Sequence, residues 1–237
     1  TADEVANMKD NSVLISFLYP HLNPSIVKTM LKKKITSFAM ELVPRISRAQ
    51  DMDALSSQAT IAGYKAVLLA ADNSKFFFPM LTTAAGSVRP AKVFIIGVGV
   101  AGLQAIATAR RLGAQVSAYD VRPETKEQTE SLGAKFLDTG VQAVGEGGYA
   151  RELTAEEKTK QAEALQKHIS SCDVIITTAG VPGKPAPKIL SKKMVEGMKP
   201  GAVVVDILAD MGGNCELTKP GETIYHNDVA IIGPINI

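Results

Sequence analysis

Hydrophobic and polar positions along the first third of this chain follow strand and helix periods in turn. We expect a buried strand over Val13–Phe17, a helix over Pro24–Lys33 with proline in its first turn, and a second strand over Ile35–Leu42. These segments make one β-α-β unit. From Met52 to Phe78 apolar residues recur at helical spacing, which predicts one long helix closed by Pro79.

A turn-prone stretch, Ala84–Pro90, separates this region from the next and is the candidate hinge. After it, Lys92–Ile96 is a near-continuous β-branched and aromatic run of the kind found in strands covered on both faces. Helices and strands then alternate, which favours an α/β fold with a doubly wound parallel sheet. The expected elements are helices near Val100–Leu112 and Pro123–Leu132, and strands at Gln115–Tyr119, Asp173–Thr177, Ala202–Ile207 and Val229–Ile232.

The pattern divides the chain into three regions. We expect an N-terminal α/β domain over 1–55, a linking helix and hinge over 56–87, and a second α/β domain over 88–237. An insertion between Thr139 and Ser171 begins Gly-rich and continues as a charged helix, whose Thr154 and Glu157 have the spacing of a capping box. The Gly-rich loop, 139–153, should be mobile.

Composition narrows the function classes. The 26 basic and 24 acidic side chains among 237 residues leave a net charge of +2, which argues against a nucleic-acid partner. No apolar run is long enough to predict a membrane span. Cys172 and Cys215 form no CxxC or Cys/His cluster, so neither a metal site nor a disulfide framework is expected, and a reducing compartment is the default. The chain opens on Thr1 with no targeting peptide that we can recognise, so a processed fragment is plausible.

The sequence that carries chemistry is the G-x-G-x-x-G run from Gly97 to Gly102. It lies where a predicted buried strand ends and an Ala-rich helix begins. The first glycine allows a tight turn, Gly99 lets a pyrophosphate approach the backbone, and the third permits close helix packing. The N–H groups of Val100 and Ala101, in the first turn of the helix, would then face phosphates. The alternative interpretation is that these glycines serve only loop geometry.

An acidic residue follows at the distance expected for dinucleotide binding. Asp120 ends the next predicted strand, just before Val121, where its carboxylate can accept hydrogen bonds from an adenosine ribose and repel a 2′-phosphate. NAD is therefore favoured over NADP as the cofactor. Arg122 lies close enough in sequence to accommodate that phosphate, and Asp120 as a simple helix cap is the other interpretation.

With these motifs in place, the chain resembles the NAD(H)-binding domain of proton-translocating NAD(P) transhydrogenase. Nearly the whole chain takes part in the resemblance, and alanine dehydrogenase shares the fold and some of the same motifs. The motifs that carry it are Lys92–Asp120 with GVGVAGLQAIATARRLGAQV at its centre, Pro44–Asp53, Gly147–Ala150, Pro182–Pro187 and Gly212–Cys215.

The resemblance implies a Rossmann NAD-binding domain together with a portion of a second Rossmann-like domain. It also implies direct, Re/Si-specific hydride transfer between NAD(H) on this chain and NADP(H) on a separate domain, coupled to proton movement through a membrane domain. Those two domains are the expected partners, and a homodimer is implied as well. The location would be the soluble face of an energy-transducing membrane, either an organelle inner membrane or a bacterial cytoplasmic membrane. By resemblance the chain is truncated at both ends.

Four residues at the junction of the first two regions are expected to act on the nicotinamide. Arg45 is a fixed donor fork able to hold a carboxamide oxygen, and Gln50 can bond an amide or a ribose hydroxyl. By resemblance these two orient the ring and its ribose, while Asp53 and Ser56 contact the carboxamide. The alternative is an exposed ion pair between Arg45 and Asp53, with Ser56 capping a helix.

Further cofactor contacts are expected in the second region. By resemblance Gly148, Tyr149 and Ala150 belong to a loop that closes over the nucleotide, although Tyr149 could instead anchor its own domain. Ala179, Gly180 and Val181 follow a strand at a carboxyl edge of the sheet, where backbone contacts to adenosine or ribose are expected. Val121 and Asn214 complete the predicted cofactor-binding set.

Two other functions compete with the transhydrogenase interpretation. An alanine dehydrogenase needs a proton-transfer residue, and His21 and Asp210 resemble that enzyme's catalytic histidine and aspartate. A solvent-facing loop position is the alternative for His21. A non-enzymatic NAD-sensing module is the third hypothesis, since a dinucleotide fold alone does not establish catalysis.

Overall fold

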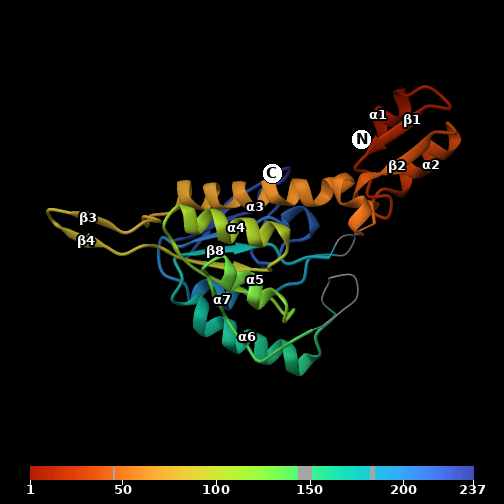
Figure 1. Ribbon diagram of the computed structural model, residues 1–237. Coiled ribbons are helices and arrows are strands. Elements are labelled where there is room, and N and C mark those ends of the chain that lie inside the picture. Colours follow the sequence, from red (N-terminus) through yellow and green to blue (C-terminus); the bar gives the residue numbers. More distant parts are fainter. Residues whose placement is uncertain (45, 144–150, 182–184) are drawn as a thin grey trace. The chain divides into compact units, whose positions relative to one another are not determined.

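A computed structural model describes residues 1–44, 46–143, 151–181 and 185–237 (Figure 1). Contacts divide the chain into two compact units, Thr1–Gln58 and Ala59–Ile237.

The first unit contains the predicted β-α-β arrangement. Strand β1 (Val13–Ser16), helix α2 (Pro24–Lys32) and strand β2 (Thr36–Ala39) follow in order, and the two strands pair in parallel. Helix α1 (Ala2–Asn7) precedes them, and its Val5 joins Met30 and Ile35 in a small core.

The second predicted strand of this unit was too long. It ends at Ala39 and is followed by two 3-10 segments, Met40–Leu42 and Ser47–Met52. Glu41 explains the early end, because its carboxylate is buried and accepts hydrogen bonds from the backbone N–H groups of Leu18 and Tyr19. These bonds hold Glu41 against the loop that follows β1, where the chain has left the strand direction.

The second unit is built on a seven-stranded sheet in the order β10-β11-β9-β8-β5-β6-β7. Every neighbouring pair is parallel except β10 with β11. This confirms the predicted doubly wound parallel sheet. The strands are β5 (Lys92–Ile96), β6 (Gln115–Tyr119), β7 (Lys135–Phe136), β8 (Val174–Thr177), β9 (Val203–Asp206), β10 (Thr223–His226) and β11 (Val229–Ile232).

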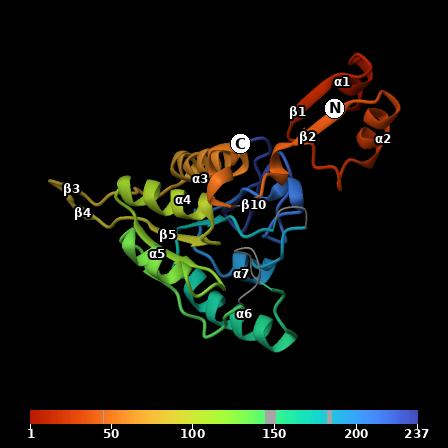
Figure 2. The same ribbon diagram turned by 45° about the vertical axis from the view of Figure 1, so that its right-hand side comes forward.

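Helices cover both faces of this sheet, and alternate residues of the strands point into two cores. Val93 and Ile95 of β5 pack with helices α3 (Ala54–Asn73) and α4 (Val100–Arg111). Phe94 and Ile96 pack with α6 (Ala155–Ile169) and α7 (Lys192–Glu196) on the other side. The same separation of α4 from α6 by the strands is visible in Figures 1 and 2. Burial on both faces explains why these strands read as continuous apolar runs.

The stretch before β5 differs from the prediction. The long helix ends at Asn73 rather than Phe78, and a hairpin of β3 (Leu81–Thr83) and β4 (Gly86–Val88) follows. The predicted turn-prone stretch supplies its turn and second strand. Both views show this hairpin projecting away from the sheet (Figures 1 and 2).

Several elements were correctly placed and others were missed. The capping box of Thr154 and Glu157 begins α6 as predicted. Helix α5 spans Thr125–Ser131, inside the predicted range. Strands β7 and β10 and helix α7 are short and had no clear period in the sequence. Among the described residues, no helix is both long and apolar enough to cross a membrane.

Candidate functional site

The glycine-rich turn lies between the end of β5 and the start of α4, as predicted. Gly97 has φ +95°, and a Cβ there would lie 2.7 Å from the backbone nitrogen of Ala179. A Cβ on Gly102 would clash with the carbonyl oxygen of Gly97. Gly99 is different, because no described atom lies within 4 Å of the position its Cβ would take. Two glycines therefore allow close backbone packing, and the middle one leaves open space above the turn.

The N-terminus of α4 faces this open space. Gly99 is the N-cap residue, and no side chain of the described residues caps the helix there. Val100 and Ala101, the first two residues of the helix, are only partly buried. Arg110 and Arg111 occupy the last turn at the opposite end, where they complement the helix dipole. An uncapped N-terminus beside an open glycine turn has the donors and the field that an anion requires.

Asp120 lies at the carboxyl end of β6 and bonds directly to the glycine turn. Its Oδ2 accepts from the backbone nitrogen of Val98 at 2.7 Å. The guanidinium of Arg122 holds the same carboxylate with Nε at 2.9 Å from Oδ1 and Nη2 at 2.7 Å from Oδ2. Arg122 Nη2 also donates to the carbonyl of Val98 at 3.0 Å. The predicted ribose-binding carboxylate is thus locked to the turn by an arginine.

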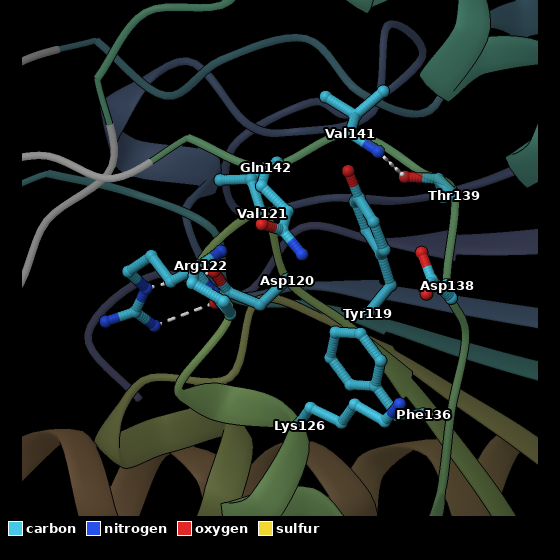
Figure 3. Close-up of a pocket in the computed structure, with 11 residues that line it drawn as sticks. Tyr119, Asp120, Val121, Arg122, Lys126, Phe136, Asp138, Thr139, Val141 and Gln142 are labelled. Carbon is cyan, nitrogen blue, oxygen red and sulfur yellow. Dashed lines mark hydrogen bonds and ion pairs between the residues drawn. The ribbon is translucent and has the colours of Figure 1, made fainter.

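A cavity of about 150 Å³ opens beside this pair. Figure 3 shows Asp120 and Arg122 on one side of it and Phe136, Asp138 and Thr139 on the other. Whole small-molecule sites have volumes of roughly 300–1,000 Å³, so this cavity matches one end of a dinucleotide rather than all of it. The remaining lining residues are Tyr119, Val121, Pro123, Lys126, Val141 and Gln142.

The far side of this cavity was missed at the sequence level. Phe136 ends β7, a strand of only two residues, and Asp138 to Gln142 follow it; the sequence marked residues from Thr139 onward only as the start of a Gly-rich loop, not as part of a ligand cavity. The usable signal was topological, because loops at the carboxyl ends of neighbouring parallel strands meet at one edge. Tyr119 also lines this cavity, and its hydroxyl accepts a hydrogen bond from Gln161 Nε2 at 2.9 Å. Burial raises the pKa of Tyr119, with hydrogen bonds to Thr139 and Gln161 acting in the opposite direction.

The loop after β8 lies against the glycine turn. Thr178 Oγ1 donates to the carbonyl of Gly97 at 2.8 Å, and a Cβ on Gly180 would lie 2.5 Å from Leu208. Asn214 is fully buried beneath this loop. Its amide nitrogen donates to the carbonyls of Ala179 and Pro187 at 2.7 and 2.9 Å, and its oxygen accepts from the Ala179 nitrogen at 3.1 Å. These bonds hold the backbone of the loop, and direct contact of Asn214 or Val181 with a nucleotide remains a prediction.

The four residues expected to orient the nicotinamide belong to the first unit. Gln50 is exposed in the 3-10 segment that ends at Met52. Asp53 precedes α3 and receives two hydrogen bonds from Ser56, from its nitrogen at 2.9 Å and from its hydroxyl at 2.6 Å. These bonds cap the start of α3, and joint action of the two side chains on a carboxamide stays a prediction. Arg45 lies outside the described residues.

Other predicted site residues also lie outside the described residues. These are Gly148, Tyr149 and Ala150, together with most of the Gly-rich loop that contains them. The closing role expected for this loop stays a prediction.

The two residues of the dehydrogenase alternative are both exposed. His21 lies in the first unit, where its ring meets the edge of Tyr19 with 6.5 Å between centroids. Asp210 lies in a 3-10 segment of the second unit, Ala209–Met211.

Comparisons with known proteins also divide the chain into an N-terminal and a C-terminal part. Residues 1–62 match the family model described as alanine dehydrogenase/PNT, N-terminal domain, and residues 66–237 match the C-terminal domain. An NAD(P) transhydrogenase alpha-subunit protein of Rhodospirillum rubrum is 52% identical over 239 residues, which cover 99% of this chain and 62% of that protein. An alanine dehydrogenase of Halomonas elongata is 30% identical, covering 92% of this chain and 54% of the enzyme.

A solved structure extends the likeness to three dimensions. The transhydrogenase from Sinorhizobium meliloti superimposes with a TM-score of 0.89 at 48% identity, covering all of this chain and 64% of that one. The chain thus spans somewhat less than two thirds of the length of these relatives.

Proposed function

This chain belongs to the alanine dehydrogenase/PNT family, and on that premise we propose that it is the NAD(H)-binding component of a proton-translocating NAD(P) transhydrogenase. It exchanges a hydride with NADP(H) held on a separate domain, and a membrane domain couples the exchange to proton movement. In this proposal the chain works as a homodimer at the soluble face of the membrane.

The observation that carries the proposal is the open glycine turn at the uncapped N-terminus of α4. Gly99 has space where a Cβ would otherwise stand, and this fits the close approach of a pyrophosphate. The N–H groups of Val100 and Ala101 would hold its oxygens. Asp120, fixed at the neighbouring strand end, would accept from the adenosine ribose. The residues present therefore fit the cofactor.

When bound, NAD(H) supplies the redox chemistry, since its C4 gives or takes a hydride with two electrons while the partner's NADP(H) undergoes the reverse change. No proton is released between the two rings, so the chain needs no acid or base for this step. Its task is positioning. Arg45, Gln50, Asp53 and Ser56 orient the nicotinamide in this proposal, and Gly148–Ala150 excludes water by closing over it.

The decisive assay mixes this chain with a bacterial transhydrogenase NADP(H)-binding domain, NADH and thio-NADP⁺. We expect thio-NADPH to form only when both proteins are present. Arg45→Ala and Gln50→Ala should depress this transfer more than they weaken NADH binding. Equal losses in both measurements would contradict an orienting role.

The same assay separates the rival functions. Oxidation of NADH by pyruvate and ammonia, with no second protein, would identify an alanine dehydrogenase that uses His21 or Asp210. NADH binding without either reaction would favour a sensing module.

A further inference from the structure

The carboxylate of Asp120 has four hydrogen bonds among the described residues. Its Oδ1 accepts from the backbone nitrogen of Arg122 at 3.0 Å and from Nε at 2.9 Å. Its Oδ2 accepts from the Val98 nitrogen and from Arg122 Nη2, both at 2.7 Å. An ionised carboxylate offers about four lone-pair positions, so four donors saturate it. A ribose hydroxyl can bond Asp120 only by replacing or sharing one of them.

The four donors differ in how readily they can move. Two are backbone N–H groups fixed by the glycine turn and by the end of β6. The other two belong to the guanidinium of Arg122, whose side chain is 18% exposed and lines the cavity (Figure 3). A long side chain can rotate without disturbing the backbone, so the guanidinium is the donor that a ligand would displace.

We propose that Arg122 is a latent ligand for a 2′-phosphate, and that its pairing with Asp120 is what makes this site select NAD(H) over NADP(H). This inference rests on the proposed function, because it assumes that the adenosine end of a dinucleotide enters this cavity. The charge of Asp120 neutralises the guanidinium, and the carboxylate repels a phosphate dianion that enters the cavity.

The position of Arg122 does not depend on Asp120 alone. Its Nη2 also donates to the carbonyl of Val98, which anchors the guanidinium to the glycine turn. If the carboxylate lost its charge, the arginine would stay at the cavity wall, where its planar fork can make bidentate contact with a phosphate. The site would then contain the usual NADP-selecting residue already in place.

Two other charged side chains line the cavity and must be separated from this effect. Lys126 could attract any phosphate, and Asp138 could repel one. Asp138 is exposed and its Oδ1 accepts from the backbone nitrogen of Gly140 at 2.8 Å. Asp138→Asn therefore removes the same charge from the same cavity without releasing Arg122, and it is the matched control.

The experiment measures the dissociation constants of NADH and NADPH by titration calorimetry for the full chain and four variants: Asp120→Asn, Arg122→Gln, the double variant Asp120→Asn with Arg122→Gln, and Asp138→Asn. Wild type should prefer NADH. Asp120→Asn should shift the affinity ratio toward NADPH by roughly 10- to 100-fold, the range that charge-assisted hydrogen bonds supply. The double variant should lose most of this shift, and Asp138→Asn should move the ratio less than about threefold.

Asparagine keeps an acceptor for the Val98 nitrogen, and Asp120→Ser provides a second variant should Asp120→Asn fail to fold. Adenosine 2′,5′-bisphosphate and 5′-AMP, which differ only in the 2′-phosphate, serve as additional probes. An absent shift, or an equal shift in the double variant, would overturn the role of Arg122 while leaving NADH binding intact. A wild-type chain that binds neither dinucleotide would overturn the proposed function and this inference with it.

Discussion

The two ends of the seven-stranded sheet each carry an aspartate held by an arginine, and the two pairs are built differently. Asp173, at the amino end just before β8, has a side chain with no exposed surface and receives both guanidinium nitrogens of Arg89 at 2.6 and 2.9 Å. Lys199 and the Lys92 nitrogen each add a bond of 2.9 Å. Asp120, at the carboxyl end, likewise receives four hydrogen bonds.

The difference lies in where the donors come from. The partners of Asp173 are 84, 81 and 26 positions away along the chain, so the carboxylate fastens three separate segments together. The described donors to Asp120 are Arg122, two residues on, and Val98 in the adjacent turn. Bonds between distant segments form only in the folded chain, so their loss lowers the free energy of unfolding, whereas a local pair beside a cavity can rearrange at little cost to the rest. Saturated hydrogen bonding alone does not distinguish a structural carboxylate from a functional one.

The sharpest test of this contrast is Asp173→Asn. We expect the free energy of unfolding to fall by roughly 2–4 kcal/mol, because a buried carboxylate that holds four hydrogen bonds, two of them ion pairs with the partly exposed Arg89 and Lys199, loses its charge. For a chain of this size the melting temperature should drop by about 5–10 °C. The dissociation constant for NADH should change less than about twofold. Glu222→Gln, which breaks the exposed Lys219–Glu222 pair, is the control and should barely alter the melting temperature.

The stabilising contribution of Asp173 should also be visible in the pH dependence of unfolding. Burial alone would raise the pKa of Asp173, but the bonds from Arg89, the Lys92 nitrogen and Lys199 outweigh it and lower the pKa to about 2. Since the folded-state pKa lies below the ordinary value of 3.8, this stabilisation is present above about pH 4 and is lost as the pH falls toward 2. An Asp173→Asn chain with the wild-type acid unfolding curve would contradict the assignment.

At the carboxyl end of the sheet, Gly99→Ala should weaken NADH binding and leave stability unchanged, the reverse of what we expect for Asp173→Asn. Gly99 has φ −85° and no described atom within 4 Å of its Cβ position, so alanine fits the folded chain and the melting temperature should stay within about 2 °C. The added methyl group would occupy the space proposed for the pyrophosphate. We expect NADH to bind roughly 10- to 100-fold more weakly, measured by calorimetric titration.

Gly102→Ala supplies the contrast for that experiment. Its Cβ would meet the Gly97 carbonyl, so stability and binding should both fall. Unchanged NADH affinity in Gly99→Ala would remove the glycine turn as the phosphate site.

Asn214→Ala probes whether every residue at the carboxyl end is functional. The side chain is fully buried, and all three of its described bonds go to the backbone of Ala179 and Pro187. We expect a loss of roughly 1–2 kcal/mol in unfolding free energy, since buried backbone groups lose their partners. The melting temperature should fall while NADH affinity weakens only as far as the Ala179 loop shifts. A large loss of affinity at unchanged stability would instead indicate direct contact with the nucleotide.

The sequence predicted the sheet well because its strands are buried on both faces. Lys92–Ile96, Gln115–Tyr119 and Val229–Ile232 carry enough β-branched and aromatic residues to be placed to the residue. The glycine turn was also predictable, because spacing and context are both local. The hairpin at Leu81–Val88 was missed because its strands have three residues each, too few to show a period.

The features of the site that escaped prediction depend on partners distant in sequence or on side-chain geometry. Asp120 was expected to have a carboxylate available for a ribose hydroxyl. Nothing in the sequence pattern indicated that Arg122 would occupy its hydrogen-bonding positions. Gln161 bonds the Tyr119 hydroxyl, 42 residues away in sequence. The partners of Asn214, Pro187 and Ala179, are 27 and 35 residues away. Such pairings are set by tertiary packing, and periodicity and short motifs carry no information about it.

The smallest expected effect concerns His168, which lies in the last turn of α6, near the amino ends of the parallel strands. Its Nε2 lies 2.8 Å from Ser117 Oγ, and its ring packs edge-on against Phe94. Burial, and then the nearby charge of Lys92, lower the pKa of His168. The unfolded chain therefore binds a proton more readily than the folded one. Stability is full above the ordinary histidine pKa of about 6.5 and declines as the pH falls below it.

His168→Gln removes this titration while keeping a group that can bond Ser117. Urea unfolding at several pH values between about 5 and 7.5 should give a flatter stability profile in the variant than in wild type. NADH affinity should show the same pH dependence in both proteins, because His168 acts through folding and lies away from the glycine turn. Parallel stability profiles would show that the histidine is solvated like an exposed one. A change confined to the pH dependence of binding would mean that this end of the sheet also communicates with the site, and the contrast between Asp173 and Asp120 would then fail.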